Sequence, residues 1–356
     1  MVPIFFYIPK KLLPPRLPAQ GEGFWHWQNS QAERFRQGRY FWTIQTYFRL
    51  CEAGVDCQLV GNIPQKGILI AHWDSLPNYF MPGPELLCVC IQADRPKHAY
   101  AQIHIVQNPL DASSQAADTC QGSLNRGNFH IRHWPQPDLI PRSPDAGDRF
   151  RRVVHMGWSD SIAPELLSDG WRQKLSAMGL EWAIVSPDRW HDYSNVDAIL
   201  SVRSFDYVGQ YLYKPASKLI NAWQAGVPAI LGRESAFRAE RQSELDYIEV
   251  TSVDEALAAL IYLQNGPVRR TAMIENGRQR AQSTSASAVV TAWQTFLTEV
   301  AEPAYTDWCH QPLLRKRLFL QRLRLQEKAA RTAAGWRNRL LRRDVSFLQK
   351  TLDPIR

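Results

Sequence analysis

The sequence alternates short apolar runs with helix-like segments, and this alternation limits the fold more than any other feature. In the first half, a helical segment near Gln31–Ala53 lies among strand-like runs at Ile4–Ile8, Cys57–Val60, Gly67–His72, Leu86–Gln92, Gln102–Gln107 and Phe129–Trp134. Runs that stay apolar without alternating are typical of parallel strands covered on both faces. The first half is therefore predicted to form a parallel sheet flanked by helices.

The same pattern restarts after Pro135–Asp148, a segment that contains four prolines. Further strand-like runs are Arg152–Met156, Leu180–Ser186, Ala198–Val202, Val227–Leu231 and Asp246–Thr251, and the helical segments are Pro164–Met178, residues 216–225, Val253–Gln264 and Ser285–Val300. Two such halves predict an α/β protein with two Rossmann-like domains that face each other across a cleft. We divide the chain into an N-terminal domain (residues 1–140), a linker (141–150), a C-terminal domain (151–300) and a basic helical tail (301–356).

The positive charge of the chain lies in the tail. The net charge is +8, yet residues 310–356 alone hold 13 Lys and Arg against 3 Asp and Glu, which leaves a net charge of −2 on the rest. A basic helix that carries Leu and Trp is typical of contact with an anionic membrane, and residues 312–343 are the candidate segment for such contact. The alternative is a solvated helix whose apolar residues pack on the protein body. No nucleic-acid motif is present, so no nucleic-acid partner is expected.

Several motifs that would assign a chemistry are missing from the sequence. No GxGxxG follows a predicted strand, and no GxxxxGK[ST], HExxH, GxSxG or paired CxxC occurs. These absences argue against a dinucleotide dehydrogenase, a P-loop ATPase, a zinc enzyme and an α/β-hydrolase. Asp-x-Asp is also absent, so we expect neither a metal ion nor another cofactor.

The compartment is indicated by the cysteines and the apolar runs. Six cysteines without a CxxC pair do not form a disulfide framework and indicate free thiols. The longest apolar runs, such as Leu86–Ile91, fall well short of the ~18 residues that span a bilayer. We expect a cytoplasmic protein, peripheral at the inner membrane face if the tail binds lipid.

The stretch YLYKPASKLINAWQAGVPAIL, Tyr211–Leu231, places two lysines at the start of a helix. Pro215 is suited to a first helical turn, and the helix is predicted to end at Gly226. Lys214 and Lys218 oppose the helix dipole there, at a cost of about 0.3–1 kcal/mol each. A bound anion would reverse that cost, because free N–H groups at a helix N-terminus also attract anions.

Arg203 strengthens the case for an anion site, because it follows the strand-like run Ala198–Val202. Ligands of open α/β sheets bind at the carboxyl ends of the strands. Arg203, Lys214 and Lys218 would therefore converge on a phosphate group. The alternative is that both lysines are solvated and that Arg203 pairs with Asp206.

The segment KPASKLINAWQAGVPAIL resembles the donor-binding element of GT-B glycosyltransferases, in which a basic residue precedes a helix and a Gly-x-Pro-x-Ile turn. The resemblance is clearest over residues 150–300 and implies that Arg203, Lys214 and Lys218 hold the diphosphate of a nucleotide-sugar donor. Many members carry a Glu seven or eight residues after the first basic residue, and none stands there in this chain. Asn221 or Glu234 would have to replace it.

The resemblance also implies that the N-terminal domain binds the acceptor, a glycan or a lipid-linked molecule. His72 and Asp74 follow one predicted strand and Asp94 follows another, which makes these three the candidate catalytic residues. His155 ends the first strand of the second domain and is a candidate donor ligand. For each histidine the alternative is a purely structural hydrogen bond.

Trp25 and Trp27 in GFWHWQ are candidates for stacking on an acceptor sugar. The expected function is metal-independent sugar transfer from a nucleotide-diphosphate donor. Two alternatives stay open: a nucleotide-sugar 2-epimerase, which would need paired carboxylates, and a non-catalytic binding or scaffold protein.

Overall fold

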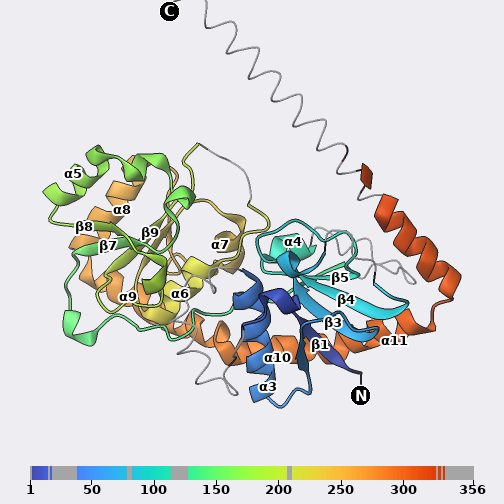
Figure 1. The fold of residues 1–356 in the computed structure, drawn as a ribbon. Coiled ribbons are helices and arrows are strands. Elements are labelled where there is room, and N and C mark those ends of the chain that lie inside the picture. Colours follow the sequence, from blue (N-terminus) through green and yellow to red (C-terminus); the bar gives the residue numbers. More distant parts are fainter. Residues whose placement is uncertain are drawn as a thin grey trace, which may run out of the picture.

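The structure is a computed structural model of the chain. It describes residues 2–14, 17, 38–77, 82–113, 127–206, 211–325, 328–329 and 332. The described residues form two parallel sheets with helices around them (Figure 1). The predicted fold class, an α/β protein with two Rossmann-like domains, is confirmed.

The first sheet has six parallel strands in the order β2-β1-β3-β4-β5-β6. Its strands are β1 (Ile4–Tyr7), β2 (Gln58–Val60), β3 (Lys66–His72), β4 (Glu85–Ile91), β5 (Ile103–Val106) and β6 (Gly127–His130). The central strands β3 and β4 are buried from their second residue onward. Burial on both faces explains why these runs are apolar without alternation.

The second sheet has five parallel strands in the order β11-β10-β9-β7-β8. Its strands are β7 (Arg152–His155), β8 (Glu181–Ile184), β9 (Ala198–Ser201), β10 (Ala229–Leu231) and β11 (Ile248–Glu249). In each sheet the strand order changes direction beside the strand that comes first in the sequence, β1 or β7. The chain connections on the two sides of that point therefore run in opposite directions. Such a switch point opens a crevice at the carboxyl ends of the strands.

The α-helices around the sheets include α3 (Gln45–Glu52), α4 (Pro109–Ser113), α5 (Asp169–Ala177), α6 (Ser217–Ala225), α7 (Ser235–Glu240), α8 (Val253–Asn265), α9 (Pro267–Ser283), α10 (Ala286–Phe296) and α11 (Glu302–His310). A π-helical segment, Arg39–Ile44, leads into α3, and another, Leu297–Ala301, joins α10 to α11. A further helix covers residues 313–325. Gly226 ends α6 at a φ of 68°, the left-handed conformation that glycine adopts most easily.

Two helices differ from the sequence expectation. The segment expected as one helix over Pro164–Met178 is a 3-10 turn, Pro164–Leu167, followed by α5. Ser168 separates them, because its side chain accepts a hydrogen bond from the N–H of Trp171 and so caps a new helix. Helix α9 was not expected, since it buries only Arg270, Met273 and Gly277 and has no clear apolar face.

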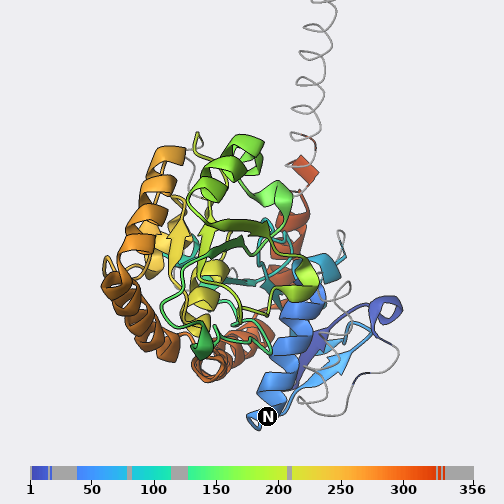
Figure 2. The same ribbon diagram turned by 90° about the vertical axis from the view of Figure 1, so that its left-hand side faces the viewer.

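The helices after the second sheet return to the first one. Helix α10 and its continuation run along the first sheet in Figure 1. Val289, Trp293 and Phe296 of α10 belong to the same buried cluster as the strands β1, β3, β4 and β5. The division by sequence grouped α10 with the C-terminal domain, whereas its buried face packs on the first sheet. Figure 2 shows these C-terminal helices in a view turned by 90°.

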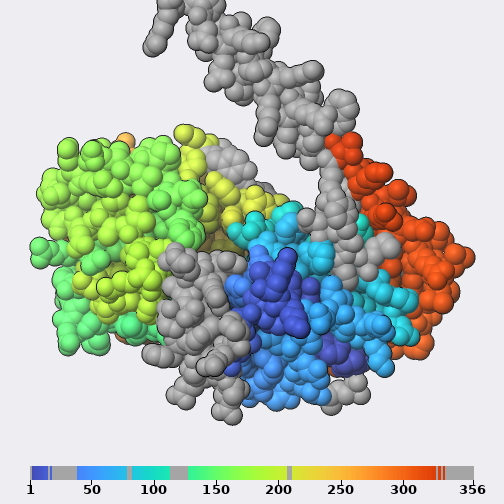
Figure 3. All heavy atoms as spheres, in the orientation of Figure 1, coloured from blue at the N-terminus to red at the C-terminus, as the bar shows by residue number. Residues whose placement is uncertain are grey.

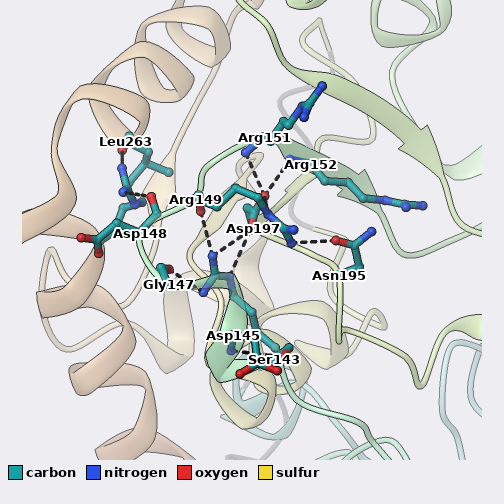
Figure 4. A network of polar contacts seen from close by, with 12 residues as sticks. Ser143, Asp145, Gly147, Asp148, Arg149, Arg151, Arg152, Asn195, Asp197 and Leu263 are labelled. Carbon is teal, nitrogen blue, oxygen red and sulfur yellow. Dashed lines mark hydrogen bonds and ion pairs between the residues drawn. The ribbon is translucent and has the colours of Figure 1, made fainter.

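The proline-rich linker is held firmly to the second sheet. Asp197, whose side chain is fully buried, accepts hydrogen bonds from the Arg142 guanidinium and from the backbone N–H groups of Arg151 and Arg152 (Figure 4). Arg142 also donates to the carbonyls of Gly147 and Arg149. These bonds fix the path by which the chain passes from one sheet to the other.

In the part of the chain that the structure describes, no helix is both long enough and apolar enough to cross a membrane.

Candidate functional site

A cavity of about 500 Å³ lies between the carboxyl ends of the two sheets. Its walls come from segments that follow β4 and β6 in the first sheet and β7, β8 and β9 in the second, together with the start of α6. It is large enough for a small ligand. In the space-filling view, the first half (blue to cyan) lies beside the second half (green to yellow) (Figure 3).

The N-terminal end of α6 forms part of the cavity wall. Pro215, Ser217 and Lys218 all line the cavity. Among the described residues, no side chain caps this helix end at Ala216. The first N–H groups of α6 are therefore available to an anion in the cavity.

Lys218 presents a positive charge at this helix end. Among the described residues, its ammonium makes no hydrogen bond and no ion pair. Burial, together with the nearby charge of Arg203, lowers the pKa of Lys218 from 10.5 to about 8. The charge of Glu234 acts in the other direction but does not outweigh these effects. A half-buried ammonium that makes no ion pair is unfavourable unless an anion joins it.

Arg203 lines the cavity beside Lys218 and is held from behind by Glu234. Arg203 Nε lies 3.0 Å from Glu234 Oε1, and the Glu234 side chain is only 4% exposed. The alternative partner considered from sequence, Asp206, is thus not the partner of Arg203. Glu234 itself does not line the cavity, so it contacts Arg203 rather than the cavity space.

Lys214 bridges the cavity to the first sheet. Its Nζ lies 3.0 Å from Oδ2 of Asp94, which follows β4. Burial raises the pKa of Asp94, but the charge and hydrogen bond of Lys214 outweigh this, and the net pKa is lowered. Ala93, just before Asp94, has a positive φ of 50°, an uncommon conformation that turns the chain toward the cavity.

His155 lies beneath the cavity rather than on its surface. Its side chain is fully buried, and Nδ1 is 3.1 Å from the hydroxyl of Ser201. Burial and the charge of Lys218 lower its pKa to about 3. Gly157 covers it, because a Cβ at Gly157 would stand 2.6 Å from His155 Nε2 and 3.2 Å from Lys218 Cε.

His72 and Asp74 do not line the cavity. The N–H of Asp74 donates to His72 Nδ1 at 3.1 Å, so Nδ1 is the acceptor nitrogen and Nε2 carries the proton of the neutral ring. Burial lowers the pKa of His72 to about 4. Gly38 separates the ring from the cavity, since a Cβ there would stand 2.6 Å from Nε2. Asp74 pairs instead with Arg95, at 3.1 Å.

His133, which the sequence analysis did not select, has the opposite proton arrangement. Its Nδ1 donates to the carbonyl of Trp134, so Nε2 of the neutral ring carries the lone pair. His133 lines the cavity and packs edge-on against Trp42, with ring centroids 4.6 Å apart. Burial lowers its pKa to about 4, although the bond to Trp134 and the charge of Asp94 act in the other direction.

Two tryptophans line the opposite part of the cavity. Trp158 follows β7 and Trp190 follows β8, and their rings meet edge to face with centroids 5.3 Å apart. The indole N–H of Trp190 donates to the carbonyl of Val185, which fixes that ring. Trp158 is 47% exposed and lines the cavity, so its apolar ring surface is accessible to a ligand.

No family model matches the sequence, and no curated protein matches it. Among solved structures, HepE from Anabaena in complex with UDP matches with a TM-score of 0.51 at 10% identity, over 84% of this chain and 100% of that one. Sucrose-phosphate synthase from Thermosynechococcus elongatus matches at 0.44 and 13% identity, over 78% of this chain and 79% of that one. The pneumococcal O-GlcNAc transferase GtfA matches at 0.46 and 11% identity, over 73% and 60%.

The match to HepE, together with the two parallel sheets, identifies the fold. The chain has the GT-B fold. At such low identity the likeness concerns the fold alone.

Within this GT-B fold, five of the residues selected from sequence line the one cavity: Asp94, Arg203, Lys214, Lys218 and Asn221. Asn221 reaches it from α6, where its side-chain oxygen accepts a hydrogen bond from the N–H of Gln136. His72, Asp74, His155 and Glu234 lie behind the cavity wall. Trp25 and Trp27 lie outside the described residues.

The residues that sequence reasoning missed are Phe41, Trp42, His133 and Trp158. Trp42 and His133 are far apart in the chain, and neither belongs to a recognisable motif. Trp158 carried a signal, because it follows a strand end in VVHMGW, which is where α/β folds place ligand contacts.

Proposed function

We propose that this protein is a glycosyltransferase that takes a sugar from a nucleotide-diphosphate donor and transfers it to a glycan or lipid-linked acceptor. One observation carries the proposal. Arg203, Lys214 and Lys218 meet in the cavity at the uncapped start of α6. Three cations and a helix N-terminus together form a strong site for a diphosphate.

In this proposal the cations stabilise the leaving group. As the sugar departs, negative charge grows on the nucleoside diphosphate, and groups already aimed at it lower the barrier. Lys218 has no counter-ion among the described residues, so it binds the diphosphate directly. Glu234 positions Arg203, and Asn221 is placed to accept or donate a hydrogen bond to the donor sugar. The charge supplied by these side chains is the reason we expect transfer without a metal ion.

The two tryptophans provide the platform for the nucleoside. Trp158 and Trp190 lie on the same side of the cavity as β7 and β8, beside the cations that would hold the diphosphate. A nucleobase or ribose can pack on the exposed face of Trp158. The matching structure of HepE is a complex with UDP, which makes UDP-sugars the first donors to test.

On the acceptor side we place the general base at His133 rather than at His72. A base must offer a lone pair to the acceptor hydroxyl, and Nε2 of His133 carries one, whereas Nε2 of His72 carries a proton. The low pKa of His133 would rise on donor binding, because the diphosphate brings negative charge close to it. Asp94, freed when Lys214 turns to the diphosphate, would support the same proton transfer.

The experiment is a donor panel with the purified full-length protein. UDP-, GDP-, ADP- and CMP-sugars are incubated with the protein in EDTA, and nucleotide release and product mass are followed. We expect one nucleotide class to be bound and slowly hydrolysed, and faster release once a suitable acceptor glycan is added.

The same panel separates the alternatives. A sugar epimer released without transfer would indicate a nucleotide-sugar 2-epimerase. Tight binding with no turnover against a broad acceptor set would indicate a binding or scaffold protein. No binding of any nucleotide sugar would overturn the proposal.

A further inference from the structure

The helix over residues 313–325 has two apolar faces, and one of them packs on the protein body. Lys316 is 3% exposed and Leu320 is 6% exposed. Lys316 Nζ donates to the carbonyls of Pro84 and Cys309, at 2.8 and 3.0 Å. Leu320 belongs to the core of the first sheet, and Phe319 and Leu323 pack against that core. This face fixes the helix in one rotational setting.

The other apolar face points to solvent. Leu314, Leu318 and Leu325 are 70%, 57% and 67% exposed. At 3.6 residues per turn they fall within roughly 40° of one another, and they lie roughly 170° from the buried face. Leucines so exposed and so aligned are unusual on a helix that is already anchored by its opposite side.

Arginines flank this leucine stripe on both sides. Arg317 and Arg324 lie along one edge, Arg315 and Arg322 lie along the other, and all four are exposed. The helix 313–325 contains no Asp or Glu. The outer face is therefore a narrow apolar line between two rows of positive charge.

We propose that this outer face, Leu314, Leu318 and Leu325 with the four arginines, docks on an anionic lipid surface. The leucines would enter the boundary between headgroups and acyl chains, and the arginines would extend to the phosphates on either side. Each basic residue near such a surface adds to the electrostatic attraction. The body supplies the rigidity, because the opposite face of the helix is packed on the first sheet.

The charge pattern disfavours other occupants. A second copy of the chain on the same face would bring four arginines against four arginines without a carboxylate between them. A nucleic acid would meet leucines at the centre of the patch, where a phosphate-binding surface needs cations. One helix face is also far narrower than the roughly 800 Å² per partner of a stable protein interface.

The placement of the helix separates anchoring from the candidate site. Helix 313–325 lies at the end of the first sheet that is remote from the second sheet (Figures 1 and 3). The cavity between the sheets is thus not covered by the docking face. The inference does not depend on the proposed function, since it uses no residue of the cavity.

The test is sedimentation of the full-length protein with vesicles. Vesicles of phosphatidylcholine with about a third of phosphatidylserine are compared with pure phosphatidylcholine. We expect binding to the anionic vesicles that weakens in high salt. The triple variant Leu314→Gln/Leu318→Gln/Leu325→Gln should bind about tenfold or more weakly, since one factor of ten corresponds to only about 1.4 kcal/mol.

The matched control is Ile261→Gln/Val268→Gln, which removes two apolar side chains, 46% and 82% exposed, from the surface of the second domain. It should bind vesicles as the wild type does, and all proteins should show the same thermal unfolding. Equal vesicle binding by the triple variant and the wild type would overturn the proposal, as would equal binding to both kinds of vesicle. A wild-type dimer that the triple variant abolishes would assign the face to a second copy instead.

Discussion

Two histidines of the first domain differ in which ring nitrogen carries the proton. His72 accepts a hydrogen bond at Nδ1 from the N–H of Asp74, whereas His133 donates one from Nδ1 to the carbonyl of Trp134. The neutral rings must therefore be protonated at Nε2 in His72 and at Nδ1 in His133. Strand ends can be recognised in a sequence, but the direction of these two hydrogen bonds cannot. His72 was selected because it ends a predicted strand, and His133 was missed because no such pattern marks it.

We predict that His133→Phe lowers kcat by about 10²–10⁴-fold, the usual contribution of a general base. The donor KM should change little, because His133 is not among the groups proposed to hold the diphosphate. His72→Phe, which alters a buried ring behind Gly38, is the matched control and should retain much more activity. Steady-state kinetics at saturating acceptor would measure both.

The fall of kcat/KM at acidic pH is a second measurement that tests the role of His133. With a pKa of about 4 in the free protein, the ring is neutral above that pH and loses its lone pair to a proton below it. For the wild type, kcat/KM should therefore hold from neutral pH down to about 5 and then fall. Equal kcat values for His133→Phe and the wild type would remove His133 from the mechanism.

At the scale of single elements, the turn after β7 packs tightly against the residues at the proposed diphosphate site. Gly157 follows the strand closely and lies over both His155 and Lys218. Helix α6 begins opposite this turn and offers its N–H groups. The absence of a side chain at Gly157 therefore keeps the space in front of Lys218 open.

We predict that Gly157→Ala weakens nucleotide-diphosphate binding at least about fivefold, although it removes no charge. The new methyl group would stand 2.6 Å from His155 Nε2, so either that fully buried ring or the turn must move. Calorimetric titration with the nucleotide that the panel selects would measure the loss. Gly170→Ala is the control, since a Cβ there meets nothing nearer than 4.0 Å. Unchanged affinity in Gly157→Ala would show that the ligand does not approach this turn.

Most strands and the start of α6 could be predicted because they depend on local patterns. Continuous apolar runs marked the strands, and Pro215 with Gly226 marked the ends of α6. Helix α9 was not predicted because only three of its 17 residues are buried, which leaves no clear apolar pattern. The return of α10 to the first sheet was not predicted either, since an apolar helix face does not tell which sheet it will cover.

The candidate site was partly predictable for the same reason. Arg203, Lys214 and Asp94 follow strands or begin a helix, and chain topology alone brings such positions to one edge. Glu234 was expected to contact the donor, but it lies behind Arg203 as its ion-pair partner. That distinction depends on side-chain direction, which periodicity does not reveal.

At the scale of the whole molecule, polar contacts join the two domains, and one of them lies at the cavity. Lys214 pairs with Asp94, Arg132 pairs with Glu240 at 2.9 Å, and Asn108 donates to the hydroxyl of Ser235 at 2.8 Å. The Lys214–Asp94 pair is partly exposed and worth at most about 1 kcal/mol. A diphosphate held by Lys214 would therefore displace Asp94 at little cost.

The central claim is that the cations at the start of α6 hold a nucleoside diphosphate. The most direct measurement is the affinity of the purified protein for UDP, or for the nucleotide that the panel selects, in the wild type and in Lys218→Ala. Exposed Lys174 on α5 provides the matched control, Lys174→Ala. Because the pKa of Lys218 is about 8, wild-type affinity should also decline as the pH rises through that value. We predict that Lys218→Ala binds at least about tenfold more weakly at pH 7, a loss of about 1.4 kcal/mol, while Lys174→Ala binds normally. Equal affinity of Lys218→Ala and the wild type would contradict the account.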